Sequence, residues 1–379
     1  MALTINHQTN DISSSSGTVT IAGAAVGGGA DLYSANESSP AAQPSATGAN
    51  GIAIGDTALA SGVRGMSLGF SSTASGEDSS ALGRATASGD ASAAVGFYAE
   101  AQGAGSVAMG YSAIASASFA GAFGRDGRAA GENSITMGRS YASGADSFAA
   151  AIGNNTASYG ATGANSIAIG LTNKATSTKS LAIGGSSNSS TGNHSSTIGG
   201  TASTASGFGS YAIGTSCIAD ADYSYAIGSG GKTNGILHKH AVGLNNGQQG
   251  ADYLLGHTTA DATPVALNTQ VWTPTAANQI ILQDYTAFIF SGTVVAREKG
   301  STGTDVGAWE IKGVIRRESG VGTTVLVNSV INEINAPTGW AIAITADTTF
   351  GCLKVEATGV AATSIKWLAT IKTAEVTYA

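Results

Sequence analysis

A short motif of small and bulky residues that ends in glycine returns at a nearly fixed interval along much of the chain. Relative to each glycine, position −1 is bulky, position −2 is usually Ala, and position −3 is often Ile, Val, Leu or Tyr. Most intervals between successive glycines are 14 or 15 residues. The repeat glycines are Gly55, Gly69, Gly83, Gly96, Gly110, Gly124, Gly138, Gly153, Gly170, Gly184, Gly199, Gly214, Gly228 and Gly243. So short a period predicts a solenoid of stacked coils, an architecture that builds fibres more often than active sites.

Each copy of the motif has the alternation of a β-strand. Bulky residues at −1 and −3 point to one face, and the small residues at −2 and 0 point to the other. A second, weaker strand follows, as in residues 57–60, and a corner such as Ser61-Gly62 closes the coil. Two short strands and two turns make one coil of a parallel β-roll. With one strand spacing per coil, the stack predicts a rod on the order of 70 Å long.

The composition of the repeats suggests that one roll is not stable alone. Aromatic residues are only 6% of the chain, and Ala, Ser and Gly dominate the repeats, so the roll has little apolar interior. Ordering one residue costs roughly 1–2 kcal/mol, and each buried CH2 returns only about 0.8 kcal/mol. The face of Ala and Gly can approach another backbone closely. We therefore expect rolls to pack together through this small-residue face, most simply as three chains around a threefold axis.

The repeat also resembles a known family. The run Asn-Ser-Ile-Ala-Ile-Gly170, preceded by Gly163-Ala164, is similar to the head repeats of YadA-type trimeric autotransporter adhesins over residues 48–256, with a weak last copy at Gly256. The resemblance implies a trimeric, left-handed parallel β-roll used for surface attachment. The chain departs from that family because residues 1–7 have neither the basic nor the apolar region of a secretion signal. It also shows neither coiled-coil heptads nor the family's membrane anchor.

Charge and cysteine content exclude several classes of function. Charged residues are 11% of the chain, the net charge is −7, and basic clusters are absent, so we expect no nucleic-acid partner. No apolar run reaches the roughly 18 residues of a membrane-spanning helix, so we expect no membrane span. The two cysteines, Cys217 and Cys352, fall in different segments and are interpreted as small core residues rather than a disulfide or metal pair.

The composition changes near residue 261, which predicts a second domain. Every tryptophan (Trp272, Trp309, Trp340 and Trp367) lies after it, and proline, charge and β-branched content rise together. Runs of alternating apolar and polar residues are separated by turn-formers, as at residues 299–303 and 336–339, and no helical pattern interrupts them. We therefore expect an all-β chain in which residues 262–379 form an antiparallel, jelly-roll-like β-sandwich.

A second resemblance concerns the two ends of the chain. The opening residues 3–14 and the closing residues 373–379 are similar to structural proteins of tailed phages of aquatic bacteria. This resemblance implies a homotrimeric virion fibre, a tail fibre or spike, which is made in the host cytoplasm and needs no export signal. Residues 1–47 would attach it to other tail or capsid proteins, and residues 48–261 would form the shaft. Residues 262–379 would lock the trimer and contact a glycan or protein of the host surface.

The candidate catalytic groups of this chain are carboxylates. Acidic residues recur near the predicted turns at Glu77, Asp78, Asp90, Asp126, Glu132 and Asp146. Paired carboxylates at a suitable separation could hydrolyse glycosides, but solvated charges that keep a Gly- and Ala-rich rod soluble are the simpler interpretation. A narrow roll also offers no deep sugar cleft. We therefore predict no catalytic and no cofactor-binding residues, and a protein that is not an enzyme.

Two further groups of residues are candidate sites. His238 and His240 are two positions apart, so on a strand they would share a face. Near a threefold axis, three such pairs would suit an octahedral transition-metal site; alternatively, His240 packs like Tyr211 and Tyr225 with His238 at the surface. Trp340, which follows a Pro-Thr-Gly turn, is the candidate for stacking on a sugar, and a core position is its alternative.

Three other functions stay open at this point. The protein could be a purely structural virion component, such as a capsid-decorating spike or a fibre connector. It could be a bacterial trimeric surface adhesin, which the missing secretion signal and anchor disfavour. A polysaccharide-degrading enzyme is the third. The sequence also leaves open which end of the rod faces the virion.

Overall fold

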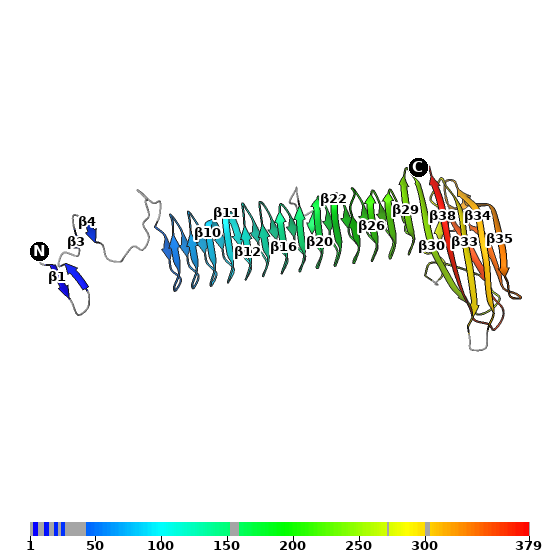
Figure 1. The fold of residues 1–379 in the computed structure, drawn as a ribbon, viewed down its shortest axis with the longest axis horizontal. Helices are drawn as coiled ribbons and strands as arrows, with labels where there is room; N and C mark the ends of the chain where they lie inside the picture. Colours follow the sequence, from blue (N-terminus) through cyan, green and yellow to red (C-terminus); the bar gives the residue numbers. More distant parts are fainter. Residues whose placement is uncertain are drawn as a thin grey trace.

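The computed structural model describes residues 43–151, 159–270, 273–299 and 304–378, together with four short strands near the start of the chain. These strands are β1 (Leu3–Asn6), β2 (Asp11–Ser14), β3 (Val19–Ile21) and β4 (Ala24–Val26), and they pair antiparallel as β1–β2 and β3–β4. The described residues contain strands and one 3-10 turn, η1 (Val321–Thr323), and no α-helix. The predicted all-β class, with a solenoid followed by a C-terminal β-structure, is confirmed (Figure 1).

The shaft is a β-roll in which each coil contributes one strand to each of two parallel sheets (Figure 1). The first sheet is formed by the motif strands β6 (Ile52–Ile54), β8 (Met66–Leu68), β10 (Ser80–Ala87), β11 (Ala93–Ala101), β12 (Val107–Met109), β14 (Gly121–Phe123), β16 (Ile135–Gly138), β18 (Phe148–Ala151), β20 (Ile167–Leu171), β22 (Leu181–Ser186), β24 (Ser196–Ile198), β26 (Tyr211–Thr215), β28 (Tyr225–Ser229) and β29 (His240–Asn245). We call it the motif sheet. Like residues stack on like, as in Ala108 opposite Ala122 and Ile213 opposite Ile227.

The second sheet lies behind the motif sheet and is called the back sheet here. It is formed by β5 (Ser45–Ala46), β7 (Leu59–Ala60), β9 (Thr73–Ala74), β13 (Ile114–Ala115), β15 (Arg128–Ala129), β17 (Tyr141–Ala142), β19 (Gly160–Ala161), β21 (Lys174–Ala175), β23 (Ser189–Ser190), β25 (Thr204–Ala205) and β27 (Ile218–Ala219), with the later halves of β10 and β11. Backbone hydrogen bonds join each coil to the next, for example Ile114 N–H to Gly127 C=O at 2.8 Å.

Small side chains fill the interior between these sheets, and this corrects our expectation about the two faces of the motif strand. The column at position −2 is inside the roll: Ala94, Ala108 and Ala122 are all 0% exposed. The bulky residues at −1 and −3 point outward instead, with Met137 53% exposed and Val242 57% exposed. The small-residue face therefore does not contact sister chains. Each coil is so thin that mostly Ala, Ser and Thr fit between its two sheets, with Asn173, Asn188 and Cys217 as larger exceptions, and the bulky aliphatic residues of the motif lie at the surface.

Most repeat glycines are required by backbone conformation. All those in the described residues except Gly243 have φ between 72° and 134°, a region that side chains rarely adopt. At Gly110, a Cβ atom would also lie 2.3 Å from the carbonyl oxygen of Gly124 in the next coil. The close backbone approach that we expected between chains is thus made between successive coils of one chain.

Two copies of the repeat differ from the sequence-based assignment. Strand register places Gly138 opposite Ala151, so Ala151 occupies the glycine position of that coil. Gly153, which we had assigned to it, lies outside the described residues. Gly256 lies in β30 (Gln248–Thr259), a long antiparallel strand, and does not close a coil.

The C-terminal domain is a sandwich of two antiparallel sheets around one core. The larger sheet has the order β30–β38–β33–β34–β35, with β33 (Thr286–Glu298), β34 (Val306–Arg317), β35 (Val325–Asn335) and β38 (Ile365–Thr377). In the smaller sheet β37 (Cys352–Thr358) pairs with β31 (Val265–Ala266), β32 (Ile280–Ile281) and β36 (Ala341–Asp347). Aromatic and aliphatic residues of both sheets form one buried cluster, which includes Phe290, Trp309 and Val355.

The domain boundary lies earlier than the composition indicated. Strand β30 pairs with β38 along its whole length, so it belongs to the C-terminal sheet although it precedes residue 262. Strand β29, the last motif strand, pairs parallel with β28 and antiparallel with β30. The motif sheet of the shaft therefore continues without a break into the larger sheet of the C-terminal domain. The cysteines Cys217 and Cys352 are both free and buried, which confirms their interpretation as core residues.

The arrangement of faces can be tested with two neighbouring residues of β25. Ala205 points into the roll and is 0% exposed, whereas Thr204 points outward from the back sheet. We expect Ala205→Leu to lower the free energy of unfolding by about 1–3 kcal/mol, because the interior has little room for the larger side chain. Thr204→Leu should leave it nearly unchanged. Circular dichroism during thermal unfolding measures both; equal melting temperatures would contradict the assignment of the interior.

Candidate interaction surfaces

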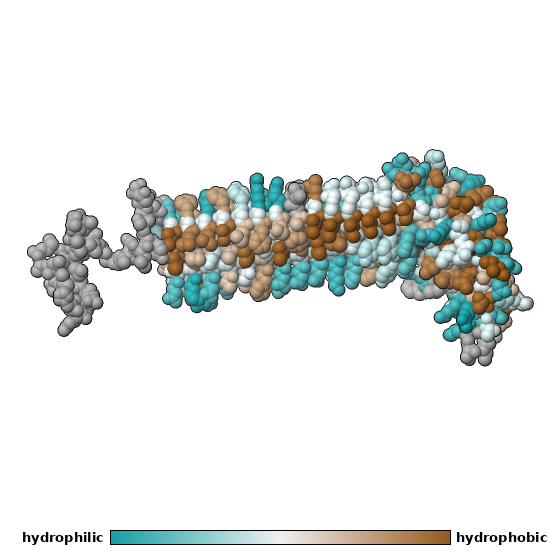
Figure 2. All heavy atoms as spheres, in the orientation of Figure 1, coloured by the Kyte–Doolittle hydropathy of each residue, from teal (hydrophilic) through white to brown (hydrophobic). Residues whose placement is uncertain are grey.

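The outer face of the motif sheet is a continuous apolar band along the shaft (Figure 2). It is built from the −1 and −3 positions of the repeat, which period-two alternation places on the face opposite the interior Ala column. The members that are more than a third exposed are Ile52, Met109, Ile135, Met137, Ile167, Ile198, Ile213, Ile227 and Val242. Exposed apolar patches of this extent mark interaction surfaces rather than ordinary solvent-facing ones.

The outer face of the back sheet has a different character. Its outward positions are a mixture of polar, charged and a few apolar residues, and they include Thr86, Glu100, Arg128, Lys174 and Thr204. The shaft is therefore amphipathic across its thickness: the outer face of the motif sheet is apolar, and the outer face of the back sheet is mostly polar. This asymmetry assigns the apolar band, and not the back sheet, as the face that a partner would cover.

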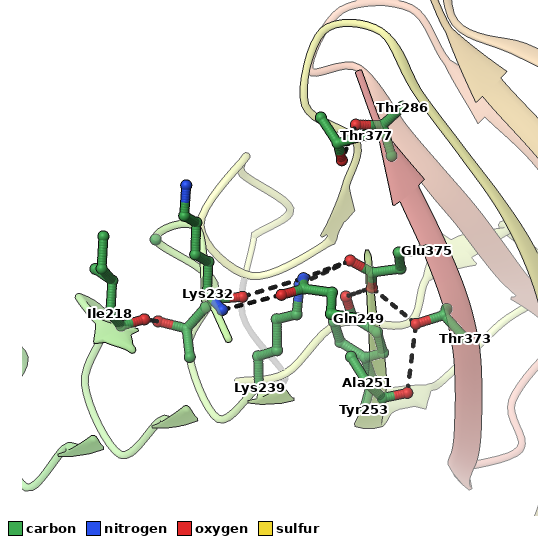
Figure 3. Close-up of polar contacts among 12 residues, drawn as sticks. Ile218, Lys232, Lys239, Gln249, Ala251, Tyr253, Thr286, Thr373, Glu375 and Thr377 are labelled. Carbon is green, nitrogen blue, oxygen red and sulfur yellow. Dashed lines mark hydrogen bonds and ion pairs between the residues drawn. The ribbon is translucent and has the colours of Figure 1, made fainter. Parts of the chain in front are cut away.

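A buried charged cluster joins the last coil of the shaft to the C-terminal domain (Figure 3). Lys239 lies in the column that Ser occupies in earlier coils, such as Ser210 and Ser224, and its side chain is 0% exposed. Its ammonium lies 3.2 Å from Oε2 of Glu375, near the end of β38. The pair connects residues that are 136 positions apart in the sequence.

The Glu375 carboxylate is fully engaged by its surroundings (Figure 3). Gln249 Nε2 donates to Oε2 at 2.6 Å, Tyr253 O–H donates to Oε1 at 2.9 Å, and Thr373 O–H donates to Oε1 at 2.7 Å. Burial by itself opposes ionisation of Glu375, but the Lys239 charge and these donors outweigh it and lower the pKa of the carboxyl. Burial likewise lowers the pKa of Lys239, and Glu375 counteracts that effect. The cluster is therefore a structural clamp between shaft and domain.

His238 and His240 do not share a strand face, so that expectation was wrong. His238 lies in a turn with φ of 60°, and β29 begins at His240. The His238 ring stacks on Tyr223 with centroids 5.4 Å apart, and the His240 ring meets Tyr225 edge-on at 4.5 Å. Within the described part of one chain, no group of three or more potential ligands surrounds them. A metal shared between chains at these histidines stays a prediction, and elemental analysis of the purified protein tests it.

Trp340 lies in the hydrophobic core of the C-terminal domain. It is 5% exposed and packs against Trp367 with ring centroids 5.7 Å apart. Trp367 in turn contacts Trp309 at 5.5 Å and donates from Nε1 to the Thr259 hydroxyl at 3.0 Å. This burial favours the core role that was the alternative for Trp340. Trp272 lies outside the described residues.

The larger C-terminal sheet has a polar depression on its outer face that the sequence did not reveal. Its volume is about 640 Å³. Its polar lining residues include Thr293, Glu310, Lys312, Asn332 and Thr370, and the apolar residues Ile311, Val330 and Ile331 line it as well. The hydroxyls of Thr293 and Thr370 are 2.9 Å apart on neighbouring strands. Cross-strand pairing alone brings these residues together, because they come from four different strands. Such a set of hydroxyl, carboxylate, amide and ammonium groups can exchange hydrogen bonds with a polar ligand.

The acidic residues of the shaft lie in its corners and take part in local contacts. Arg64 bonds Asp78 at 2.5 Å and Glu77 at 2.6 Å, and this hydrogen bonding holds the pKa of Asp78 below its ordinary value. Asp90 accepts a hydrogen bond from the backbone N–H of Glu77 at 3.0 Å. These contacts support the interpretation as solvated corner charges rather than a catalytic pair.

Comparisons with known proteins add the following. The family described as the YadA head domain repeat (2 copies) matches residues 46–70, 60–86, 87–113, 101–126, 161–187 and 205–230, all within the shaft. Among curated proteins, none matches this chain. A solved structure with some likeness is a tailspike protein of Acinetobacter baumannii bacteriophage Fri1, a capsular polysaccharide depolymerase. The identity is 7%, the TM-score is 0.22, and the alignment covers 85% of this chain and 66% of that one. A TM-score this low carries no argument about fold or activity.

The family match agrees with the repeat motif of the shaft. Among the described residues, no helix has the length and apolar character of a membrane span.

The buried clamp predicts a specific loss of stability when Glu375 is neutralised. Glu375→Gln should lower the free energy of unfolding by about 3–5 kcal/mol at neutral pH, because it removes the carboxylate that is paired directly with the buried Lys239 ammonium. Glu318→Gln removes the carboxylate of an exposed pair with Arg316 and should have a much smaller effect. Urea unfolding followed by tryptophan fluorescence reports on the C-terminal domain. Similar losses in both variants would contradict the clamp.

The same carboxyl predicts a dependence of stability on acid. The pKa of Glu375 is lowered from its ordinary value of 4.5, so its contribution is present above that pH and is lost as the pH falls through the lower folded value. Urea titrations of the wild type should therefore show decreasing stability below about pH 4.5. Glu375→Gln should show a shallower decrease over the same interval. Parallel pH profiles for the two proteins would show that Glu375 does not titrate as described.

Proposed function

We propose that the chain assembles as a homotrimeric, non-enzymatic virion fibre that attaches a phage to the surface of its host. The observation that carries this proposal is the apolar band along the motif sheet (Figure 2). When parallel copies pack through their apolar bands, these exposed aliphatic side chains are removed from water. The large aliphatic side chains of the band form the interface, in the place of the small residues that the sequence suggested.

The number of chains rests on a separate argument. Copies that run in parallel with their coils at equal heights are related by rotation about the rod axis, which gives a closed cyclic assembly. The similarity of the shaft to YadA head repeats favours three chains. The motif sheet continues through β29 and β30 into the larger C-terminal sheet. The C-terminal domains therefore lie at one end of the same axis and can hold the three shafts in register.

Attachment follows from the shape of such an assembly. The shaft is an elongated rod with the C-terminal domain at one end (Figure 1). In this proposal, residues 1–47 join tail or capsid proteins, while the C-terminal domain meets the host. The polar depression beside Glu310 and Asn332 has the hydrogen-bonding groups that a surface glycan requires. Three copies raise the effective concentration of a weak site, so that modest contacts combine into firm attachment. The identification with a phage rests on the resemblance of the chain ends to tailed-phage proteins.

A structural virion part without receptor binding, such as a capsid-decorating spike or a fibre connector, has the same shaft and the same trimer. It differs only in whether the C-terminal domain binds cells. A capsular polysaccharide depolymerase, the activity named for the phage tailspike, differs in degrading the polymer. Incubation of the full chain with purified capsule, followed by size-exclusion chromatography of the polymer, separates that activity from binding.

The assembly can be disrupted through the apolar band. Ile213→Asp places a charge in the proposed interface and should convert the trimer to monomers, because an unpaired buried charge costs several kcal/mol. Thr204→Asp places the same charge on the outward face of the back sheet and should leave the trimer intact. Sedimentation equilibrium measures both. Monomeric wild-type protein at every concentration would refute the assembly.

Host contact can be tested at the polar depression. The double variant Glu310→Ala/Asn332→Ala of the full chain should bind bacterial host cells at least tenfold more weakly, because the hydrogen bonds to the ligand are lost. The matched control is Lys354→Ala/Glu356→Ala, which removes an ion pair from the smaller sheet. Flow cytometry with fluorescently labelled protein gives the binding curves. Undiminished binding by the depression variant would favour a structural role for this domain.

A further inference from the structure

The two corners of each coil differ in chemistry along the first half of the shaft. One or two positions after the repeat glycine lies a row that we call the arginine edge; its charged and aromatic members are Asp56, Phe70, Arg84, Phe97, Tyr98, Tyr111, Arg125, Asp126 and Arg139. Five or six positions before the residue at the glycine position lies the acidic edge, formed by Glu77, Asp78, Asp90, Phe119, Glu132 and Asp146. The edges flank the apolar band because they stand at the two ends of the same motif strands.

The arginine edge is ordered and exposed. The Arg84 guanidinium lies 5.4 Å from the ring centroids of Phe70 and Phe97 and 4.6 Å from that of Tyr98. Phe97 stacks on Tyr111 at 5.6 Å, and Phe70 is 52% exposed. The described residues place no carboxylate within ion-pair distance of Arg84. Arg125 and Arg139 share one carboxylate of their own chain, Asp126, at 3.3 Å and 3.5 Å, so one of these two positive charges is left over. Arginine and aromatic residues held this way are the composition that is enriched at protein interfaces.

The acidic edge carries an excess of negative charge at the same heights. Arg64 is shared by Glu77 and Asp78, so one of these two charges is left over, and their side chains are 56% and 50% exposed. Glu132 and Asp90 are exposed as well. Phe119 adds an apolar ring that is 63% exposed. This edge therefore offers the complements of the opposite one: carboxylates for arginines, and a ring for rings.

The two edges change together along the rod. Beyond residue 159, the column of the arginine edge continues as Leu171, Gly185, Gly200, Thr215 and Ser229. The column of the acidic edge continues there with residues such as Asn165, Lys179 and His194 and has lost most of its acids. Charged residues are thus common on both edges in the coils before residue 159, and they are rarer on both edges in the coils after it. Solubility alone would not require this match.

Contact within one chain does not explain the match. Glu132 and Arg139 stand at opposite ends of β16 (Ile135–Gly138), and the 4 extended residues of this strand span roughly 13 Å. Rotation about the symmetry axis of the assembly, however, relates each coil to the equivalent coil of the next chain at the same height along the rod. In such a ring, one edge of each chain faces the other edge of its neighbour, which is a head-to-tail contact.

We infer that the arginine edge of one chain docks on the acidic edge of a second copy and forms the seams of the assembly. Arg84 meets Glu77 and Asp78 of the next chain, and Arg139 meets Glu132. The apolar band supplies non-directional attraction, whereas the seams fix the coil-by-coil register and the sense of rotation, because charge pairs suppress wrong alignments. This inference rests on the proposed cyclic assembly and adds the residues that align it.

Chemical crosslinking of the full chain tests the seam. The variant Glu132→Cys/Arg139→Cys is treated with a bismaleimide too short to reach from one edge to the other within a chain. We expect covalent dimers and trimers on denaturing gels, because each chain then offers one thiol to each neighbour. Glu132→Cys alone or Arg139→Cys alone provides a thiol on only one edge of each chain and should give no covalent trimer. Arg128→Cys/Lys174→Cys, on the back sheet, should stay monomeric on the gel; Cys217 and Cys352 are buried in all variants.

The outcomes separate this inference from the proposed function. An assembly that sediments as a trimer but gives no more crosslinks at the edges than on the back sheet would overturn the seam and leave the trimer standing. Binding of a sulfated polysaccharide such as heparin to that uncrosslinked trimer, abolished by Arg84→Glu, would assign the arginine edge to an external anionic polymer instead. A wild-type chain that is monomeric throughout would overturn the trimer and the seam together. Charge exchange gives a second measure: Arg139→Glu should lower the trimer's melting temperature, and adding Glu132→Lys should restore the part of the loss that comes from the seam, while the part that comes from Asp126 of the same chain remains.

Discussion

The narrow space between two parallel sheets governs the rest of this structure. Each coil is bonded to the next through its backbone, and the interior between the sheets holds only columns of side chains such as Ala108 and Ala205. Close packing leaves little room for larger groups there. Every bulky aliphatic residue of the motif must then lie outside, which makes the shaft a rod with an apolar face. In the proposed assembly, the association of chains is a consequence of how thin the coil is.

The end of such a stack needs its own solution, because the last coil leaves an unpaired ladder of backbone groups. Here β29 pairs with the antiparallel strand β30, which begins the larger C-terminal sheet. Ile236 of the last coil joins the core of that domain, and Lys239 reaches Glu375. A charge buried in this way is tolerated only because several donors and a counter-charge surround it. The capping domain is therefore continuous with the shaft in backbone pairing, core and electrostatics.

Different surfaces of the rod carry different parts of the proposed assembly. The apolar band has little directional preference, since aliphatic side chains can slide past one another at similar energy. Corner residues vary more from coil to coil than the band does, and so they can encode an alignment. The polar back sheet stays in contact with water. This division lets a repetitive sequence build a fibre with a defined register, although its coils are nearly identical inside.

The period of the motif and the alternation within it determined the solenoid, its strand positions and the all-β class, because backbone pairing and strand geometry act locally. The change of composition also revealed a second domain. Which face of the motif strand lies inside depended on how far apart the two sheets pack, and the sequence pattern is the same for either answer. Similarly, Ala151 took a glycine position, β30 joined the C-terminal sheet, and Trp340 entered the core through pairings between distant segments. Lys239 lies between the candidate residues His238 and His240 in the sequence. Its side chain is buried only because β38 approaches it with Glu375, 136 residues later in the chain.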